Sequence, residues 1–238
     1  MSFSGIKAFA PSMDTLGWFC RHIEDICTTF TALSRAEAIE PLPDLRGIRV
    51  GLRSLPGDRP LDPDVTQALS TTSSLLEQAG ARMCALPLDT RYDDLVRHHQ
   101  VVLAYEAAQS LASEFQQYGE EMSAKLVELI EQGLATSYAK YRASLLAAEE
   151  CRQGLSRVFA EEVDVILAAS APGVAPQGLG ATGDPIYCRA WTLLGVPCLN
   201  LPLNKGQEGL PVGVQLIADR WQDERLLSIA RTLVAAEG

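Results

Sequence analysis

Two short apolar runs bounded by proline and glycine constrain the fold of this chain most strongly. They cover residues 195–203 and 210–217, and each is rich in Val, Leu and Ile. Runs of this length are too short for typical helices, which favours buried strands. Residues 204–209 between them are polar and contain glycine, so they can reverse the chain. We therefore predict strand, loop and strand within residues 182–216, with irregular strand ends because prolines donate no ladder hydrogen bond.

The rest of the chain alternates further strands with helices. Strands are predicted at residues 47–52, 81–88 and 163–168, and helices at 15–33, 63–79, 95–118, 123–132, 137–161 and 222–236. Asp62 is suited to cap the helix that begins at Pro63. The order strand, helix, strand over residues 47–88 implies a right-handed crossover between parallel neighbours. The predicted class is α/β with a helical middle.

Composition excludes several kinds of partner. The chain has 238 residues, of which 47% are hydrophobic, as in ordinary globular proteins. Its formal net charge of -10 argues against nucleic acid or an anionic membrane as a partner, because both require a basic surface. No apolar run approaches the ~18–20 residues of a membrane-spanning helix, and the N-terminus does not resemble a signal peptide. A cytoplasmic location is expected.

The sequence contains no recognisable catalytic or metal motif. Six cysteines lie far apart without a C-x-x-C pair, which indicates structural thiols, so neither a metal nor another cofactor is expected. His98 and His99 are adjacent and would point to different helix faces. None of the four lysines lies in an apolar run that would lower its pKa. Arg152 interrupts an apolar helical stripe and is interpreted as a snorkelling side chain, with a buried ligand contact as the alternative.

An ordered series of segments nevertheless resembles one family. The segments are FAPSMDTLGWFCRHIED from residue 9, GIRVGL from 47, YEAA from 105, VDVILAASAPGVAP from 163 and TGDPIYCRAWTLLGVPCLNLPL from 182. Together they resemble the amidase signature family. The resemblance implies a mixed sheet flanked by helices, in which residues 1–238 form a single domain that is the C-terminal part of an amidase-signature domain. It also implies hydrolysis of an amide carbon–nitrogen bond through an acyl-enzyme.

The same resemblance implies that the catalytic centre lies outside this sequence. The family uses a nucleophilic serine, a second serine in a cis peptide and a lysine, all upstream of the part that resembles residues 9–17. No catalytic residue is therefore assigned, and Lys7 is not taken as the family lysine. We expect the chain to be inactive alone, and to act on a small-molecule amide only if the missing N-terminal part completes it.

The family resemblance also suggests substrate-binding residues. Residues 178–191 and 195–197 correspond to a wall of the substrate pocket, in which Tyr187 and Trp191 are candidates to contact a substrate and Asp184 and Arg189 to orient a polar group. The alternative is that Trp191 anchors packing and Asp184 belongs to a turn.

Three functional interpretations follow from these observations. The chain is the C-terminal part of an amidase, a non-catalytic binding or scaffold protein descended from one, or an active hydrolase with relocated machinery. The scarcity of histidine and lysine disfavours the third. If a missing part normally covers the sheet, an exposed apolar face and strand edge predict self-association.

Overall fold

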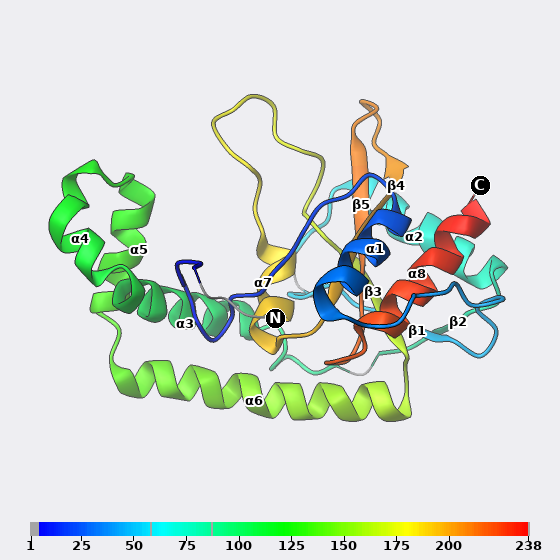
Figure 1. The fold of residues 1–238 in the computed structure, drawn as a ribbon, viewed down its shortest axis with the longest axis horizontal. Helices are drawn as coiled ribbons and strands as arrows, with labels where there is room; N and C mark the ends of the chain where they lie inside the picture. Colours follow the sequence, from blue (N-terminus) through cyan, green and yellow to red (C-terminus); the bar gives the residue numbers. More distant parts are fainter. Residues whose placement is uncertain (1–4, 58, 87, 238) are drawn as a thin grey trace.

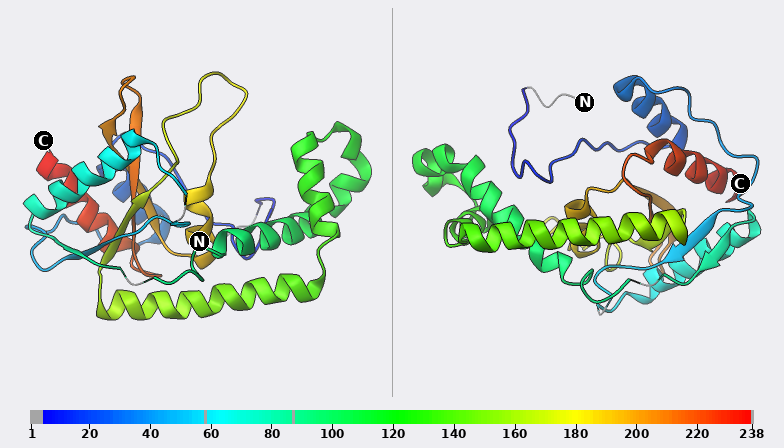
Figure 2. Two further views of the ribbon diagram at one scale, coloured as in Figure 1. Left: turned by 180° about the vertical axis from the view of Figure 1, so that it is seen from behind. Right: turned by 90° about the horizontal axis from the view of Figure 1, so that it is seen from below.

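The computed structural model describes residues 5–57, 59–86 and 88–237. Its strands are β1 (Arg49–Leu52), β2 (Arg82–Cys84), β3 (Val165–Ala169), β4 (Cys198–Lys205) and β5 (Pro211–Ile217). Its helices are α1 (Ile23–Ser34), α2 (Pro63–Gln78), α3 (Leu95–Ser110), α4 (Ala112–Tyr118), α5 (Ala124–Leu134), α6 (Tyr138–Glu161), α7 (Ile186–Leu194) and α8 (Asp223–Glu237), with a 3-10 turn η1 at Gly119–Glu121. Helices lie beside the sheet, and α3 to α6 form an arm that extends away from it (Figures 1 and 2).

The sheet is mixed, as predicted, and its strands follow the order β2-β1-β3-β5-β4. Strand β1 pairs in parallel with β2 and β3, so the crossover predicted through α2 joins parallel neighbours. Strand β5 pairs antiparallel with β3 and with β4, which is the reversal predicted for the two apolar runs. Strand β4 lies at the edge, and its ladder shifts register between Leu201 and Asn204 around Pro202.

Alternation along β3 divides the core into two clusters. All five residues of this strand are buried. Val165, Leu167 and Ala169 face the cluster formed with α1, α2 and α8. Ile166 and Ala168 face the cluster formed with α3, α6 and α7. Because successive side chains of a strand point to opposite faces, one five-residue run supports the packing of helices on both sides.

The capping prediction for α2 is confirmed. The Asp62 carboxylate accepts the backbone N–H of Asp64 at 2.9 Å, and Pro63 occupies the first turn of the helix. This cap satisfies one of the backbone donors that every helix N-terminus leaves free. The predicted helices at residues 123–132, 137–161 and 222–236 also form, with bounds that differ by one or two residues.

Three predicted boundaries are wrong. The helix predicted from residue 15 begins at Ile23, because residues 15–21 carry no helical hydrogen bonds and His22 is extended, with φ -124° and ψ 151°. Of the strand predicted at residues 81–88, in which residue 87 lies outside the described residues, only β2 is observed, and it pairs with three residues of β1. The long helix predicted at residues 95–118 divides at Leu111, whose φ of -104° and ψ of 11° interrupt the helix.

Helix α7 was not predicted, because its stretch was interpreted as a loop running into a strand. Its apolar residues bury both faces: Ile186 and Tyr187 join one core cluster, and Trp191 and Leu194 join the other. Gly195 ends the helix in the left-handed conformation at φ 65°, and its N–H donates to carbonyls of the last turn. The segment has only nine residues, which is shorter than a typical helix, and it follows a loop rich in glycine and proline, so its helical character was not recognised in the sequence.

Arg152 is neither a snorkelling side chain nor a ligand contact in this fold. Its guanidinium donates to the carbonyl oxygens of Leu193 at 3.0 Å and Leu194 at 2.8 Å. It also forms an ion pair with Glu149. Arg152 on α6 therefore binds the C-terminal end of α7, where free carbonyls favour a cation.

The helix predicted at residues 123–132 was expected to stop at Gly133, but α5 continues past it to Leu134. A Cβ at this position would overlap the backbone carbonyl of Ala104 and lie 2.6 Å from the Cβ of Ala108, both on α3. The glycine is thus required by the close approach of α5 to α3. Helix termination plays no part.

Gly133→Ala is therefore expected to lower the free energy of unfolding by about 1–3 kcal/mol, since backbone atoms of α3 must move to admit the methyl group. Gly119→Ala is the matched control, because Gly119 has helical dihedrals and its nearest neighbour, Phe115, would lie 3.5 Å from the new Cβ. We expect the control to be neutral or to stabilise by about 0.4–1 kcal/mol. Urea unfolding measures both, and equal effects would contradict this account of Gly133.

Candidate functional site

The four predicted substrate-binding residues lie at the start of α7 and along it. The loop of residues 170–185 leaves the carboxyl end of β3, projects from the body and leads into this helix (Figure 1). In α/β sheets, ligands bind preferentially beyond the carboxyl ends of the strands. The end of β3 and the start of α7 are therefore one half of the candidate site.

Tyr187 and Trp191 have their rings in the core, each only 1% exposed. The Tyr187 hydroxyl donates to the backbone carbonyl of Arg59 at 3.1 Å. The Trp191 ring packs in the cluster formed with α3 and α6, and its buried indole N–H has no hydrogen-bond partner among the described residues. In this conformation both rings anchor α7 between its neighbours, and contact with a substrate stays a prediction.

Asp184 and Arg189 are brought together at the solvent-facing end of α7. One guanidinium nitrogen of Arg189 lies 3.6 Å from a carboxylate oxygen of Asp184. The side chains of Arg189 and Asp184 are 25% and 55% exposed, respectively, so solvent and small molecules can reach both. The pair offers a cationic donor and an anionic acceptor within one short span, which suits an amide or carboxylate group.

His99, on α3, lies within the electrostatic reach of Arg189. Burial, together with the positive charge of Arg189, lowers the pKa of His99 to about 4. Its side chain is 8% exposed, and its Nδ1 has no partner within the described part of the chain. At neutral pH His99 is therefore uncharged. From the sequence, a solvated or hydrogen-bonded role is expected for His99 rather than a catalytic one, whereas the ring is buried.

Polar side chains cluster at the carboxyl end of β3, and they were not predicted from the sequence. The buried amide of Gln215 donates to the carbonyls of Ala169 at 2.6 Å and Tyr187 at 3.0 Å, which ties β3, β5 and α7 together. The Ser170 hydroxyl donates to the Asn200 side chain at 2.5 Å. The signal in the sequence was a glutamine within an otherwise apolar run, since a buried polar group in a sheet needs specific partners.

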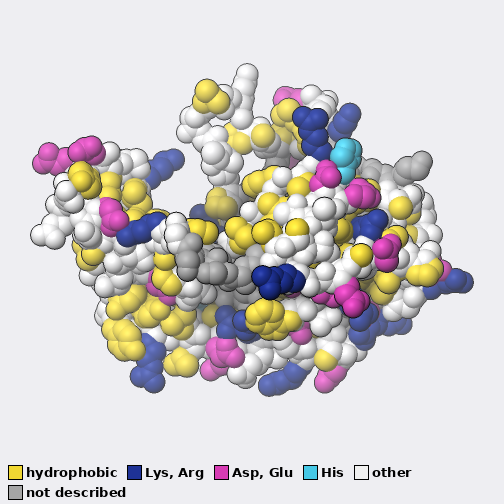
Figure 3. Space-filling view, in the orientation of Figure 1, with side chains coloured by type: hydrophobic (Ala, Val, Ile, Leu, Met, Phe, Trp, Pro, Cys, Tyr) yellow, Lys and Arg dark blue, Asp and Glu magenta, His cyan; other side chains and the backbone are white. Residues whose placement is uncertain are grey.

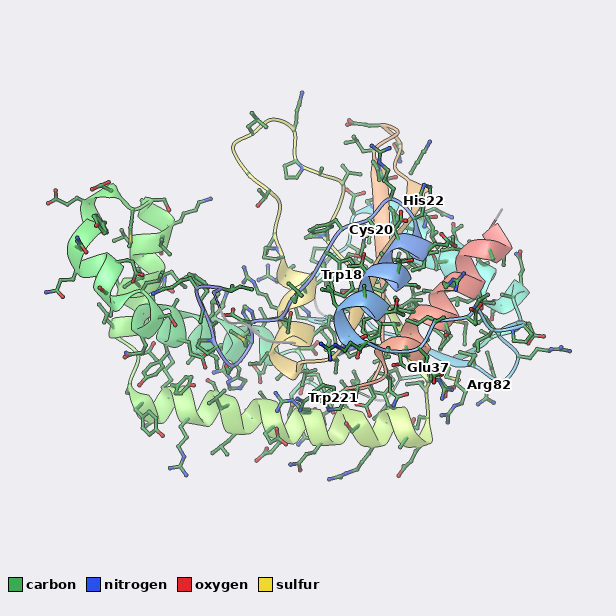
Figure 4. The ribbon with its side chains drawn as sticks, viewed as in Figure 1. Trp18, Cys20, His22, Glu37, Arg82 and Trp221 are labelled. Atoms are coloured by element: carbon green, nitrogen blue, oxygen red, sulfur yellow. The ribbon has the colours of Figure 1, made fainter. Side chains whose placement is uncertain are left out.

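A cavity of about 550 Å³ forms the other half of the candidate site. It lies between residues 12–18, the residues that join α7 to β4, and the start of α8. Figure 4 labels two of its lining residues, Trp18 before α1 and Trp221 before α8. Residues 195–197, predicted to approach the substrate, also line it, whereas the four predicted binding residues do not.

The predicted site is therefore split by a helix. Residues 184–189 lie at the start of α7, and residues 195–197 follow its end. Nine helical residues extend over roughly 13 Å at about 1.5 Å per residue. Sequence reasoning joined the two groups because it interpreted this stretch as a flexible loop.

The side chains present provide no reactive lysine. All four lysines of the chain are exposed, and Lys7 forms an ion pair with Glu114 at 2.7 Å. No group of three or more His, Cys, Asp or Glu residues within the described ranges could hold a metal ion. All six cysteines are free thiols, of which Cys27 and Cys151 are buried. None of the described helices combines the length and apolar character needed to cross a membrane.

Comparisons of this chain with family models and with curated proteins agree on one family. The family model described as Amidase matches residues 1–227. A glutamyl-tRNA(Gln) amidotransferase subunit from Prochlorococcus marinus is 25% identical over 95% of this chain and 55% of its own length. The 2-amino-5-chloromuconic acid deaminase of Comamonas testosteroni is 28% identical over 98% of this chain and 54% of its own length. The chain thus spans about half the length of the curated relatives it matches.

Solved structures share the fold. A glutamyl-tRNA(Gln) amidotransferase subunit from Thermotoga maritima superposes with a TM-score of 0.73 and 21% identity, covering 98% of this chain and 55% of that one. A crystal structure described as an amidase superposes with a TM-score of 0.72 and 24% identity, covering 92% of this chain and 52% of that one.

The low pKa of His99 predicts a specific loss of stability in acid. The unfolded chain binds a proton near pH 6.5, and the folded chain only near pH 4. The contribution of neutral His99 is therefore complete above about pH 6.5 and is lost as the pH falls towards 4. Between pH 7.5 and 4.5 we expect this group to remove about 2–3 kcal/mol of unfolding free energy.

His99→Leu, which cannot titrate, should show a smaller acid loss in urea unfolding than the wild type. His22→Gln, at the exposed N-cap of α1, should keep the wild-type dependence. An acid loss in His99→Leu as large as in the wild type would show that other groups account for it.

Proposed function

The chain belongs to the amidase family, and we propose that it is the C-terminal part of an amide hydrolase, to which it contributes the substrate-facing wall but not the reacting groups. The reaction is hydrolysis of a carbon–nitrogen bond, from an amide to a carboxylate and ammonia or an amine. The family match over most of the chain supports the reaction class. The chain matches only about half of each relative, which supports the proposal that the reacting groups belong to the other half.

One observation supports the absence of reacting groups most strongly. A serine hydroxyl attacks an amide only when a neighbouring base removes its proton and donors stabilise the oxyanion. All four lysines of this chain are exposed, and no hydrogen bond joins a lysine ammonium group to a serine hydroxyl among the described residues; the one lysine–serine bond is the helix cap from the Lys140 backbone N–H to Ser137. The family's serine and lysine centre is therefore expected in sequence upstream of the segment that resembles residues 9–17.

The substrate-facing role is proposed for Asp184 and Arg189. Their exposed pair can orient a small-molecule amide, with the guanidinium donating to a carbonyl oxygen and the carboxylate accepting an amide N–H. Tyr187 and Trp191 then act by holding α7 in place, since both rings are buried. The net charge of -10 supports a small-molecule partner and disfavours a nucleic acid or an anionic membrane.

The activity proposal is tested by incubating the purified chain with a panel of primary amides and measuring ammonia. We expect no release above the buffer blank, because the chain lacks an activated nucleophile. A full-length amidase assayed in parallel serves as the positive control. Turnover that a serine-directed inhibitor abolishes would contradict the proposal and would favour relocated catalytic machinery.

We also propose that the chain associates through the edge of its sheet. Strand β4 ends the strand order, so its outer backbone groups have no strand partner among the described residues. An apolar rim, defined as Leu16, Phe19 and Trp221, lies nearby, with Phe19 fully exposed and Trp221 85% exposed. Figure 3 shows patches of hydrophobic side chains among charged and other surface on the side of the molecule seen in Figure 1. Unpaired edges and exposed apolar groups both favour association.

Sedimentation velocity tests this association. The wild-type chain is expected to self-associate at micromolar concentration. Phe19→Glu/Trp221→Glu should sediment as a monomer, because two charges then lie on the apolar rim. Leu146→Glu is the control, since Leu146 is 54% exposed on α6 outside the rim. A compact wild-type monomer that unfolds cooperatively would count against the proposal.

A further inference from the structure

The helical arm holds the N-terminal segment through a buried carboxylate. Glu106, on α3, is only 7% exposed. One of its oxygens accepts the hydroxyl of Tyr141 on α6 at 2.7 Å, and the other accepts the backbone N–H of Ser12 at 2.9 Å. Burying a carboxylate is costly unless hydrogen bonds replace its hydration. The two hydrogen bonds therefore stabilise the buried carboxylate of Glu106. In turn, Glu106 holds the backbone of Ser12 in place.

The surroundings of Tyr141 fix its hydroxyl as a donor. Its ring stacks on Tyr105, with centroids 4.2 Å apart and an interplanar angle of 14°. Burial and the hydrogen bond to Glu106 raise the pKa of Tyr141 above its usual value, so the hydroxyl stays protonated. The orientation of the Glu106 carboxylate is thus set within the helical arm. It depends on α3 and α6, which pack against each other without the N-terminal segment between them.

Ser12 belongs to a compact turn that is docked on the arm. The Asp14 carboxylate accepts the backbone N–H groups of Phe9 at 2.8 Å and Ala10 at 3.1 Å. Ala10 and Met13 are buried in the cluster that contains α3, α6 and α7. The turn therefore moves as one unit, and Glu106 is its polar attachment to the arm.

The segment after this turn has little to hold it. No hydrogen bond involves the backbone of residues 15–21 within the described part of the chain. Its position is set by the turn at one end and by α1 at the other. Residues 12–18 nevertheless form one wall of the 550 Å³ cavity, facing the residues that join α7 to β4.

We infer that Glu106 is a positioning residue: through Ser12 it fixes the turn of residues 9–14, and thereby the 12–18 wall of the cavity. The consequence for catalysis rests on the proposed function. The family's catalytic segment precedes the part that resembles residues 9–17, so this turn also sets where that segment meets the rest of the domain. The hold on the cavity wall is independent of that function.

Amide hydrogen exchange of the full chain, read residue by residue, tests the inference without any substrate. Glu106→Gln keeps the size of the side chain but removes its charge and one acceptor oxygen, so the charge-assisted bond to the Ser12 N–H is lost, and both contacts persist only if the Tyr141 hydroxyl turns from donor to acceptor. We expect the Ser12 amide to exchange on the order of 10-fold faster, as for the loss of a hydrogen bond to a charged group. The hydrogen-bonded amides of Phe9, Ala10, Met13 and Asp14 should follow, whereas amides at the C-terminal end of α2, which exchange by local fraying that leaves the Glu106 contacts intact, should not change.

Two further variants test whether Ser12 is held by the Glu106 hydrogen bonds or by the nearby surface charge. Glu114→Gln removes the neighbouring ion pair with Lys7 and should leave Ser12 exchange unchanged, because surface charge does not hold the turn. Tyr141→Phe keeps the ring stack but removes the donor that orients Glu106, and should again accelerate Ser12. If Glu106→Gln does not fold, the Tyr141→Phe result decides.

Trp18 gives a second readout at the cavity wall. With 5-fluorotryptophan incorporated, the fluorine resonance of Trp18 should shift or broaden in Glu106→Gln, while that of the core residue Trp191 should not. Wild-type exchange at Ser12 in both Glu106→Gln and Tyr141→Phe would overturn the inference, as would equal acceleration of the amides at the C-terminal end of α2. Because no amide substrate is present, none of these outcomes depends on whether the chain takes part in amide hydrolysis.

Discussion

The burial of α7 between the sheet and the helical arm is the constraint on which the rest of this structure depends. Side chains from other elements hold the helix at both ends: Gln215 from β5 binds the carbonyl of Tyr187, and Arg152 from α6 binds the carbonyls of Leu193 and Leu194. The two core clusters meet at α7, which contributes residues to each. A helix fixed in this way gives the adjoining loop and the start of β4 defined positions.

The dependence of α7 on distant elements explains which parts of the fold can be predicted from the sequence and which cannot. Strand β3, the pair of β4 and β5, and the Asp62 cap follow from local pattern, because each depends on residues close in the chain. Helix α7 and the role of Gly133 do not, since both are set by contacts with distant elements. The same limit applies to the site. The resemblance indicated residues 178–191 and 195–197, but only the fold shows that α7 separates Asp184 and Arg189 from residues 195–197.

Two regions of different character thus lie on one scaffold. The Asp184–Arg189 pair is polar and solvent-facing, whereas the cavity beside residues 12–18 is bordered by exposed aromatic side chains. The first suits recognition of a small polar group, and the second suits contact with another part of a protein. The chain spans about half the length of its curated relatives, and under the proposed function both regions serve contacts with the remainder of such a protein.

The prolines around β4 limit what its free edge can join. Pro197 precedes the strand and Pro202 interrupts it, so residues 198–201 are the longest uninterrupted stretch of edge. Four residues extend about 13 Å, at about 3.3 Å per residue. That length can accept one short strand in a defined register, but it is too short to template the stacked strands of a fibril, which need segments of about six residues. The edge is therefore open to a specific neighbour while resisting open-ended polymerisation.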